Sequence, residues 1–341
     1  MARQLLLIAV TALAVVIAAG LGALYYMIGM PGEPYRGPLP PLSDDERALA
    51  PRLMTHITAI ASREHNVAHY DELEKSARYI ETTLESLGYT INRQNFDADD
   101  FVGGSRTVRN MEVVIEPRAD VAAPETLVVG AHYDSARGAA GANDNGSGAA
   151  AVIELARLLG DLNGKATRRI RLVLFVSEEP PYFQTEEMGS LQYATALKAR
   201  SERVVAMYSL ETLGYYAREP GSQRYPWPFG LLFPDRGDFV AFVGTLDARA
   251  RASIGSFRSH TKFPTIGGAA PASIPGIDWS DHWAFTQQGF PAIMITDTAT
   301  PVPDYAALHP GYKPCPPHTF ICVMNLVTRY ASSASPPPSV P

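Results

Sequence analysis

The stretch GAHYDSARGAAGANDNGSGAAAVIEL, residues 130–155, places one histidine and two separated aspartates in a run of small residues. His132, Asp134 and Asp144 are of the types that bind zinc, through an imidazole nitrogen and carboxylate oxygens. Aspartate and asparagine beside glycine are also ordinary turn formers. This stretch alone therefore leaves a simple turn and a metal site both open.

Acidic residues recur where predicted strands end. His132 and Asp134 end TLVVGAHYD, Glu178 and Glu179 end RIRLVLFVSEE, and Glu211 ends RVVAMYSLE. The carboxyl ends of neighbouring parallel strands meet at one edge of a sheet, where α/β folds bind ligands. Carboxylates gathered there repel one another and are costly to desolvate unless cations neutralise them. The pattern therefore predicts a metal site, and mixed histidine and carboxylate ligands favour zinc.

The elements that must position these residues alternate between strand and helix. Continuous apolar runs such as RLVLFV are typical of strands covered on both faces. The order predicts a three-layer α/β/α fold with a mixed, mainly parallel central sheet. Further strands are predicted at 89–96, 107–117 and 290–297, and helices at 43–60, 70–89, 148–159, 188–200 and 281–288.

An apolar segment precedes this fold. Residues Leu5 to Ile28 carry no charge and span about 36 Å as a helix, enough for a bilayer core of about 30 Å. Arg3 before the segment favours a domain outside the cytoplasm, periplasmic or extracellular. A signal sequence cleaved near residues 20–23, giving a secreted protein, is the alternative. Proline-rich residues 31–42 predict a semi-rigid spacer that holds the domain off the membrane.

Composition narrows the class of protein. The 341 residues are 46% hydrophobic, with a net charge of -6, no long basic run and two cysteines. These values predict a globular domain and argue against a nucleic-acid partner. The predicted organisation is a membrane anchor or signal segment at 1–30, the linker, a domain at 43–331 and a disordered tail at 332–341. Residues 215–276 lack sustained periodicity, which predicts an excursion over the site.

Six motifs occur in order along the chain. In this order they resemble the zinc-dependent exopeptidases of metallopeptidase family twenty-eight, with bacterial leucyl aminopeptidases, glutamate carboxypeptidases and, as relatives, glutaminyl cyclases. The resemblance implies hydrolysis of terminal peptide bonds in a peptide substrate, with two zinc ions and aminopeptidase activity favoured over carboxypeptidase activity. The motifs are AHYDS (131–135), GANDNGSG (141–148), SEEPPYFQTEEMGS (177–190), SLETLGYY (209–216), SDHWAF (280–285) and GFPAIMITDTA (289–299).

The resemblance also implies a role for each acidic residue. His132 would bind one zinc and Asp144 would bridge both, while Asp134 would orient a ligand from behind. Glu179 matches a zinc ligand. Glu178 matches the general base that takes a proton from the nucleophilic water.

Two further matches are less direct. Glu211 stands where many members carry an aspartate ligand, and its longer side chain can still reach a metal. Ser280, Asp281 and His282 match a substrate-side loop, and His282 is expected in the pocket rather than as a ligand. Away from the motifs, His56, His65 and His69 are predicted to be surface residues, whereas Trp227, Trp279 and Trp283 fit either a hydrophobic specificity pocket or the core.

The resemblance weakens after residue 299. Family members supply the last zinc ligand from a Tyr-His pair, but Tyr305 is followed here by Ala306. His309 could complete the site, and His318 is a poorer candidate because of its spacing. The alternatives are a frame slip near codon 300 or a defective site.

Two rival functions fit the same motifs. One is a glutaminyl-peptide cyclase, which uses a similar carboxylate set with a single zinc. The other is a tethered, non-enzymatic binding module with an incomplete metal site.

Overall fold

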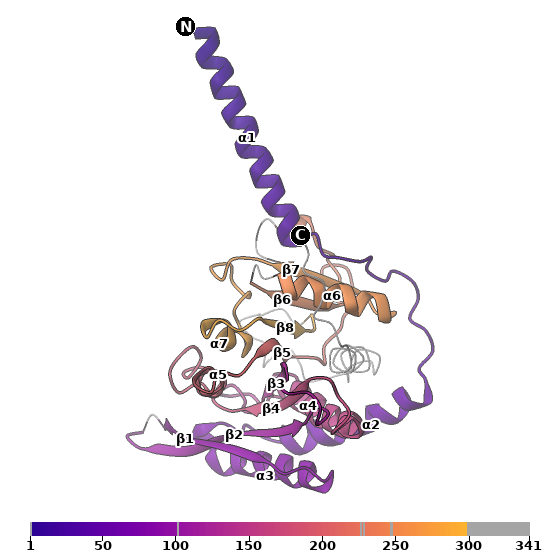
Figure 1. The fold of residues 1–341 in the computed structure, drawn as a ribbon, viewed down its shortest axis with the longest axis vertical. Helices are drawn as coiled ribbons and strands as arrows, with labels where there is room; N and C mark the ends of the chain where they lie inside the picture. The colour runs from indigo at the N-terminus through magenta and orange to yellow at the C-terminus, as the bar shows by residue number, and fades with distance from the viewer. Residues whose placement is uncertain (1, 101, 226, 228, 246–247, 299–341) are drawn as a thin grey trace.

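A mixed sheet forms the centre of the protein in the computed structural model, which describes residues 2–100, 102–225, 227, 229–245 and 248–298. The strand order among the described residues is β1-β2-β4-β3-β5-β8-β6-β7 (Figure 1). Strands β4, β3, β5 and β8 run parallel in the middle, whereas β2 and β6 pair antiparallel with them on either side. The strands are Asn92–Asp99, Ser105–Ile115, Thr126–His132, Arg169–Phe175, Val204–Glu211, Val240–Gly244, Thr265–Ala269 and Ala292–Thr296, from β1 to β8.

Helices cover both faces of the sheet, which confirms the predicted three layers. Along β3, Leu127 and Val129 point into a core shared with α2, α3, α4 and α6, whereas Val128 points into a second core with α5 and α7. This alternation is what a strand buried on both faces requires. The helices are α2 Asp44–Ile60, α3 Tyr70–Ser86, α4 Gly146–Leu159, α5 Gly189–Ala199, α6 Ala248–His260 and α7 His282–Gln287, with short 3₁₀ turns at Val67–His69, Gly160–Leu162 and Phe229–Leu231.

Helix α2 begins as its sequence predicts. The Ser43 hydroxyl accepts from the amide of Glu46, and the Glu46 carboxylate accepts from the amide of Ser43 at 2.6 Å. This reciprocal pair satisfies two amides that would otherwise lack partners at the helix start.

The N-terminal segment forms one long helix, α1 (Ala2–Ile28). Its mean hydropathy of 2.7, with none of its residues buried, makes it a candidate membrane span. Figure 1 shows α1 projecting from the body at the end where β6 and β7 lie. The helix does not stand apart from the domain, because Met30, just after it, packs against the main core. The spacer predicted at residues 31–42 thus does not separate the end of α1 from the body.

Residues 215–276 differ from the predicted excursion. They supply β6, α6 and β7, so two strands of the central sheet come from this segment. Both strands are short and rich in small residues, VAFVG and TIGGA, and neither gives the alternating pattern that marks a strand. Residues in the remaining parts of the segment line a cavity described below.

The histidines of the first helices also differ from the prediction. His56 and His65 are buried, at 9% and 1% exposed, and only the His69 side chain is half exposed. His56 contacts the Tyr79 hydroxyl at 2.8 Å and the carboxylate of Glu154 at 3.2 Å, both across the interfaces of its helix. These contacts give His56 a structural role.

Candidate active site

Three chain segments bring acidic side chains to His132 at the carboxyl end of the sheet. His132 is the last residue of β3, Glu211 is the last of β5, and Glu178 follows β4. The Nε2 atom of His132 lies 3.2 Å from the Asp144 carboxylate, 3.5 Å from that of Glu211 and 3.8 Å from that of Glu178. Glu179 joins them, since one of its oxygens lies within 4.8 Å of ligand atoms of His132 and Glu178. The strand-end pattern therefore corresponds to one cluster in space.

The small residues around Asp144 let the chain turn and start α4 beside the sheet. Gly141 has a φ of +71°, a conformation that costs other residues free energy. A side chain at Gly148, in the first turn of α4, would collide with the Leu210 carbonyl of β5. Close packing of α4 on the strand ends thus explains why the run from 130 to 155 is so poor in large residues.

Asn145 ties the start of α4 to the end of β5. Its amide donates to the Leu210 carbonyl at 2.9 Å, and its oxygen accepts from the amides of Gly148 and Thr212, each at 3.1 Å. Asn145 is fully buried. It was not predicted as a site residue, although its place directly before a helix marks it as an N-cap.

Asp134 holds the β4 end in place. Its carboxylate accepts from the backbone amides of Glu178 at 3.2 Å and Glu179 at 3.4 Å. It also lies 3.6 Å from Nδ1 of His132, on the ring edge away from the other carboxylates. Asp134 is therefore placed to orient its neighbours rather than to enter the cluster.

The protonation of the cluster reflects burial and mutual repulsion. Burial raises the pKa of Glu178 well above its usual value, and the charges of Glu179 and Glu211 add to that rise. Burial likewise raises the pKa of Glu179, and it raises the pKa of Glu211 to about 7. Burial alone would lower the pKa of His132, but Glu178 and Glu211 raise it well above its ordinary value.

These residues fit a bound divalent cation. Ligand atoms of His132, Asp144 and Glu211, and of His132, Glu178 and Glu179, lie within 4.8 Å of one another. One oxygen of Glu179 is buried without a hydrogen-bond partner among the described residues. In that part of the chain no lysine or arginine forms an ion pair with these carboxylates. A cation would supply the missing charge and the missing partner.

Residues 280–282 lie behind the cluster and not in the pocket wall. The Ser280 hydroxyl donates to the Glu211 carboxylate at 2.8 Å and lies 2.7 Å from the Ser209 hydroxyl. Burial raises the pKa of Asp281 to about 7, and neither of its oxygens accepts a hydrogen bond of ordinary geometry within the described residues. His282 is buried beside the Ile277 carbonyl, at 2.7 Å from Nε2. Of this region, the flanking residue Trp279 lines the cavity, whereas residues 280–282 are not among its lining residues, so their substrate-side role stays a prediction.

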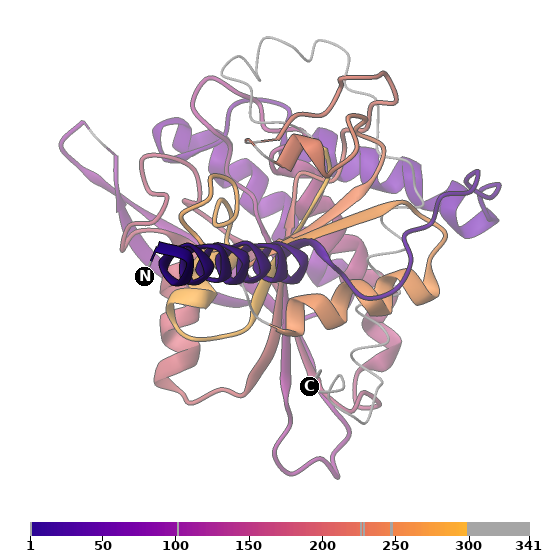
Figure 2. The same ribbon diagram turned by 90° about the horizontal axis from the view of Figure 1, so that it is seen from above.

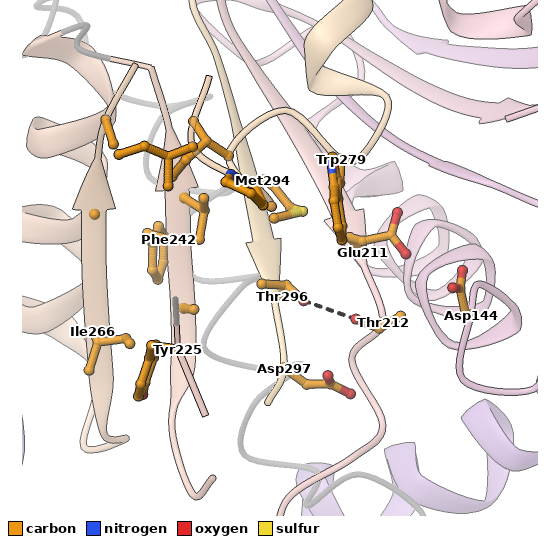
Figure 3. A pocket seen from close by; sticks show the side chains of 18 of the residues that line it. Asp144, Glu211, Thr212, Tyr225, Phe242, Ile266, Trp279, Met294, Thr296 and Asp297 are labelled. Carbon is orange, nitrogen blue, oxygen red and sulfur yellow. Dashed lines mark hydrogen bonds between the residues drawn. The ribbon is translucent and has the colours of Figure 1, made fainter. Parts of the chain in front are cut away.

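A cavity of about 770 Å³ opens beside the cluster. Figure 3 shows the carboxylates of Asp144 and Glu211 at one side of this cavity, with Phe242 and Ile266 on the strands opposite. Trp279 stands above Glu211, half exposed. The arrangement places an apolar space next to a charged one, as is typical of ligand pockets in which a few polar groups fix the orientation of the ligand.

Asp297 is a second residue that the sequence reasoning missed. It follows β8 and accepts from the amide of Tyr215 at 2.6 Å and from the Asn143 side chain at 3.1 Å. It also lines the cavity. The signal was present, because Asp297 ends a strand in the same way as the acidic residues that were singled out. His309 and His318 lie outside the described residues.

The matching family model is "Peptidase family M28", over residues 110–312. Among curated proteins, the "Uncharacterized protein YfbL" of Escherichia coli (strain K12) is 38% identical over 253 residues, covering 67% of this chain and 77% of that protein. "Leucine aminopeptidase 1" of Arthroderma otae is 28% identical over 190 residues, which cover 51% of this chain but only 44% of the relative.

Solved structures share the fold. An "Aminopeptidase from Aneurinibacillus sp. strain AM-1" superposes with a TM-score of 0.64 at 15% identity, over 86% of this chain and 96% of that one. The Fimbriiglobus ruber glutaminyl cyclase superposes with a TM-score of 0.58 at 19% identity, over 87% and 97%. At such identities the likeness concerns the fold alone, and both reaction types occur on it.

Proposed function

Because the chain belongs to peptidase family M28, we propose that it is a zinc-dependent exopeptidase that removes amino-terminal residues from peptides. The observation that carries the proposal is the cluster around His132, in which buried carboxylates converge without a lysine or arginine from the described part of the chain. The leucine aminopeptidases among the relatives favour the amino terminus as the end attacked. The proposed substrate is a peptide and the proposed cofactor is a pair of zinc ions.

The ligands follow from the geometry around His132. His132, Asp144, Glu179 and Glu211 would hold the ions, with Asp144 between them. Bound zinc polarises a peptide carbonyl and makes water a stronger acid. The hydrogen bonds from Asn145 and Ser280 fix the β5 end and the Glu211 carboxylate, so that these ligands keep their positions.

Glu178 would act as the general base. It is buried beside His132, and Asp134 accepts a hydrogen bond from its backbone amide, which fixes the backbone from which the carboxylate extends. Its pKa, raised by burial and by its acidic neighbours, suits a group that accepts a proton and then passes it to the leaving amine. The positive charge of the ions would bring this pKa down again towards the working range.

The membrane part of the proposal rests on α1. We assign residues 1–30 to an anchor, 31–42 to a linker and 43–331 to the peptidase domain, while the tail predicted at 332–341 lies outside the described residues. Arg3 before the span and a domain after it support an extracytoplasmic domain. A cleaved signal would instead release the domain, and mass determination of the N-terminus of the native protein separates the two outcomes.

The test of the reaction compares substrates for hydrolysis with substrates for cyclisation. The full chain, loaded with zinc, is incubated with a peptide library, with aminoacyl anilides and with peptides that begin with glutamine. We expect loss of amino-terminal residues and release of the anilide. Cyclisation of the glutamine peptides without hydrolysis of the others would replace the proposal with the cyclase reading, for which the Fimbriiglobus ruber neighbour is the supporting observation.

His309 remains the proposed source of the last ligand. The family match runs to residue 312 and so includes it. The frame-slip alternative is tested on the coding DNA, since translation past Asp297 in the other two frames should then give a Tyr-His-Thr segment followed by a helix. Absence of such a segment removes that alternative.

A further inference from the structure

The end of α1 is fixed to the body of the protein. The guanidinium of Arg258 in α6 donates to three successive carbonyls, those of Met30 at 3.2 Å, Pro31 at 3.1 Å and Gly32 at 2.7 Å. The glycine at position 267 of β7 leaves room for Met30, because a Cβ there would come within 2.7 Å of its Cγ. The helix therefore leaves the domain at a defined place and not from a loose tether.

Tyrosines mark the level of the bilayer surface on α1. A hydrocarbon core of about 30 Å takes about 20 helical residues, which run from Leu5 to Leu24. Tyr25 and Tyr26 come next and are 74% and 42% exposed. Tyrosine is enriched at the membrane–water interface. Because Met27 and Ile28, the next two residues, already line the cavity of the domain, the surface of the bilayer falls within about one helical turn of the domain.

An exposed apolar loop lies at this end of the molecule. Within residues 225–233, Trp227 is 87% exposed, Leu231 80% and Leu232 44%. The inner side of the loop is different, since Tyr225, Phe229 and Phe233 pack on one another and line the cavity. Large apolar side chains gathered on a loop tip mark an interaction surface.

The cavity connects this surface with the cluster. Its wall includes Met27 and Ile28 from the last turn of α1 as well as Asp144, Glu178 and Glu211. In Figure 2, which looks down on the molecule from the α1 end, the helix stands over the middle of the body. A space that starts at the carboxylates and ends beside a membrane helix is open to molecules that lie on the bilayer.

We propose that the face around the end of α1 rests on the phospholipid bilayer, with Trp227, Leu231 and Leu232 inserted in its interface. The cavity then receives the apolar terminal residue of peptides that are themselves bound to the membrane surface. This inference rests on the proposed peptidase function and on α1 as an anchor. It adds the place where substrate is met and the class of substrate, an apolar peptide held at the bilayer.

The first experiment measures the depth of single tryptophans. The full chain carrying W279F and W283F, which keeps Trp227, is placed in nanodiscs with and without brominated phospholipid. The control carries W227F and W279F and keeps Trp283, which is half-buried on α7, below the α1 end in Figure 1. We expect bromine to quench Trp227 strongly and Trp283 weakly. Equal, weak quenching of both would overturn the docking.

The second experiment measures the consequence for substrate. The variant W227S/L231S is compared with V102S, which changes an equally exposed residue, 87%, at the β1–β2 turn far from α1. Each enzyme in vesicles receives one peptide with an N-terminal leucine, with or without a C-terminal stearyl chain. We expect W227S/L231S to lower kcat/KM for the stearyl peptide about tenfold and to leave the soluble peptide unchanged, with V102S altering neither.

The outcomes separate the two proposals. Equal loss on both peptides, or loss on neither, would overturn the link between the loop and membrane-bound substrate. If the parent chain hydrolysed neither peptide, the proposed peptidase function would fail, while the quenching result would still decide whether the loop docks on the bilayer.

Discussion

Two buried clusters lie at different points along helix α4, and each contains a histidine and a glutamate. They differ in the partners that the described residues offer to the carboxylates. In the third turn of α4, Glu154 is 2% exposed and contacts His56, Arg52 and Arg157. Burial alone would raise the pKa of Glu154, but these hydrogen bonds and the arginine charges lower it to about 2. Beside the start of the helix, at the end of β5, burial raises the pKa of Glu211 to about 7.

The two clusters differ in whether an arginine pairs with their carboxylates. Glu81 and Glu112, elsewhere in the domain, are each paired with an arginine as Glu154 is. The carboxylates around His132 have no such partner within the described residues. Within the described residues, the other buried glutamates are paired with arginine and this group is not, which supports the proposal that it binds a cation from outside.

The largest effect that tests this contrast is on turnover. We expect Glu178→Gln to lower kcat by about 10²- to 10⁴-fold while zinc binding stays nearly intact, because the amide keeps the shape but cannot accept a proton. The measurement is steady-state hydrolysis of an aminoacyl anilide, with zinc determined on the same sample. The matched control is Glu154→Gln, which should leave turnover unchanged. Wild-type turnover in Glu178→Gln would remove that residue from its proposed role.

The next largest effect is expected on the zinc content of the protein. Asp144→Asn should lose zinc, because a position between two ions needs a charged oxygen. Elemental analysis after gel filtration reads the number of ions per chain. Retention of two zinc ions in this variant would count against Asp144 as the shared ligand.

A smaller change in zinc content is expected when the proposed last ligand is removed. If His309 supplies the last ligand, His309→Ala reduces the zinc content from two ions to one. His318→Ala serves as the control and should retain both. The reverse pattern would transfer the ligand role to His318, and a parent chain that never holds two ions would favour the non-enzymatic reading.

The smallest effect concerns stability. Glu154→Gln should lower the free energy of unfolding by about 1–3 kcal/mol at neutral pH, since it takes the carboxylate from His56 and two partly exposed arginines. Because the folded pKa lies below the usual 4.5, this stabilisation is present above that pH and is lost as the pH falls towards 2. Urea unfolding of both proteins at pH 6 and pH 3 measures it. An equal difference at both pH values would contradict the assignment.

Much of this arrangement could be predicted from the sequence. The central strands carry long apolar runs, and their acidic ends identify His132, Glu178 and Glu211 because parallel strands bring their carboxyl ends together. The capping box at Ser43 located α2. In each case the signal lies within a short stretch of sequence. General rules about helix starts and parallel sheets turn it into a structural prediction.

What could not be predicted depends on contacts between distant segments. Strands β6 and β7 are five residues each and contain glycines, so only the pairing of β6 with β8 and of β7 with β6 reveals them. His56 looks like a surface residue until α4 brings Glu154 to it. Likewise, only the seating of Met30 against β7 shows that the proline-rich linker does not hold the domain away from α1.

We propose that no arginine from the described residues pairs with the cluster around His132 because the cluster binds metal. The most direct test is elemental analysis of the full chain purified in detergent without added metal or chelator, with Glu154→Gln as a folded control. We predict two zinc ions per chain in both proteins. A folded chain that holds no divalent metal, and takes up none in a zinc titration, would contradict the account.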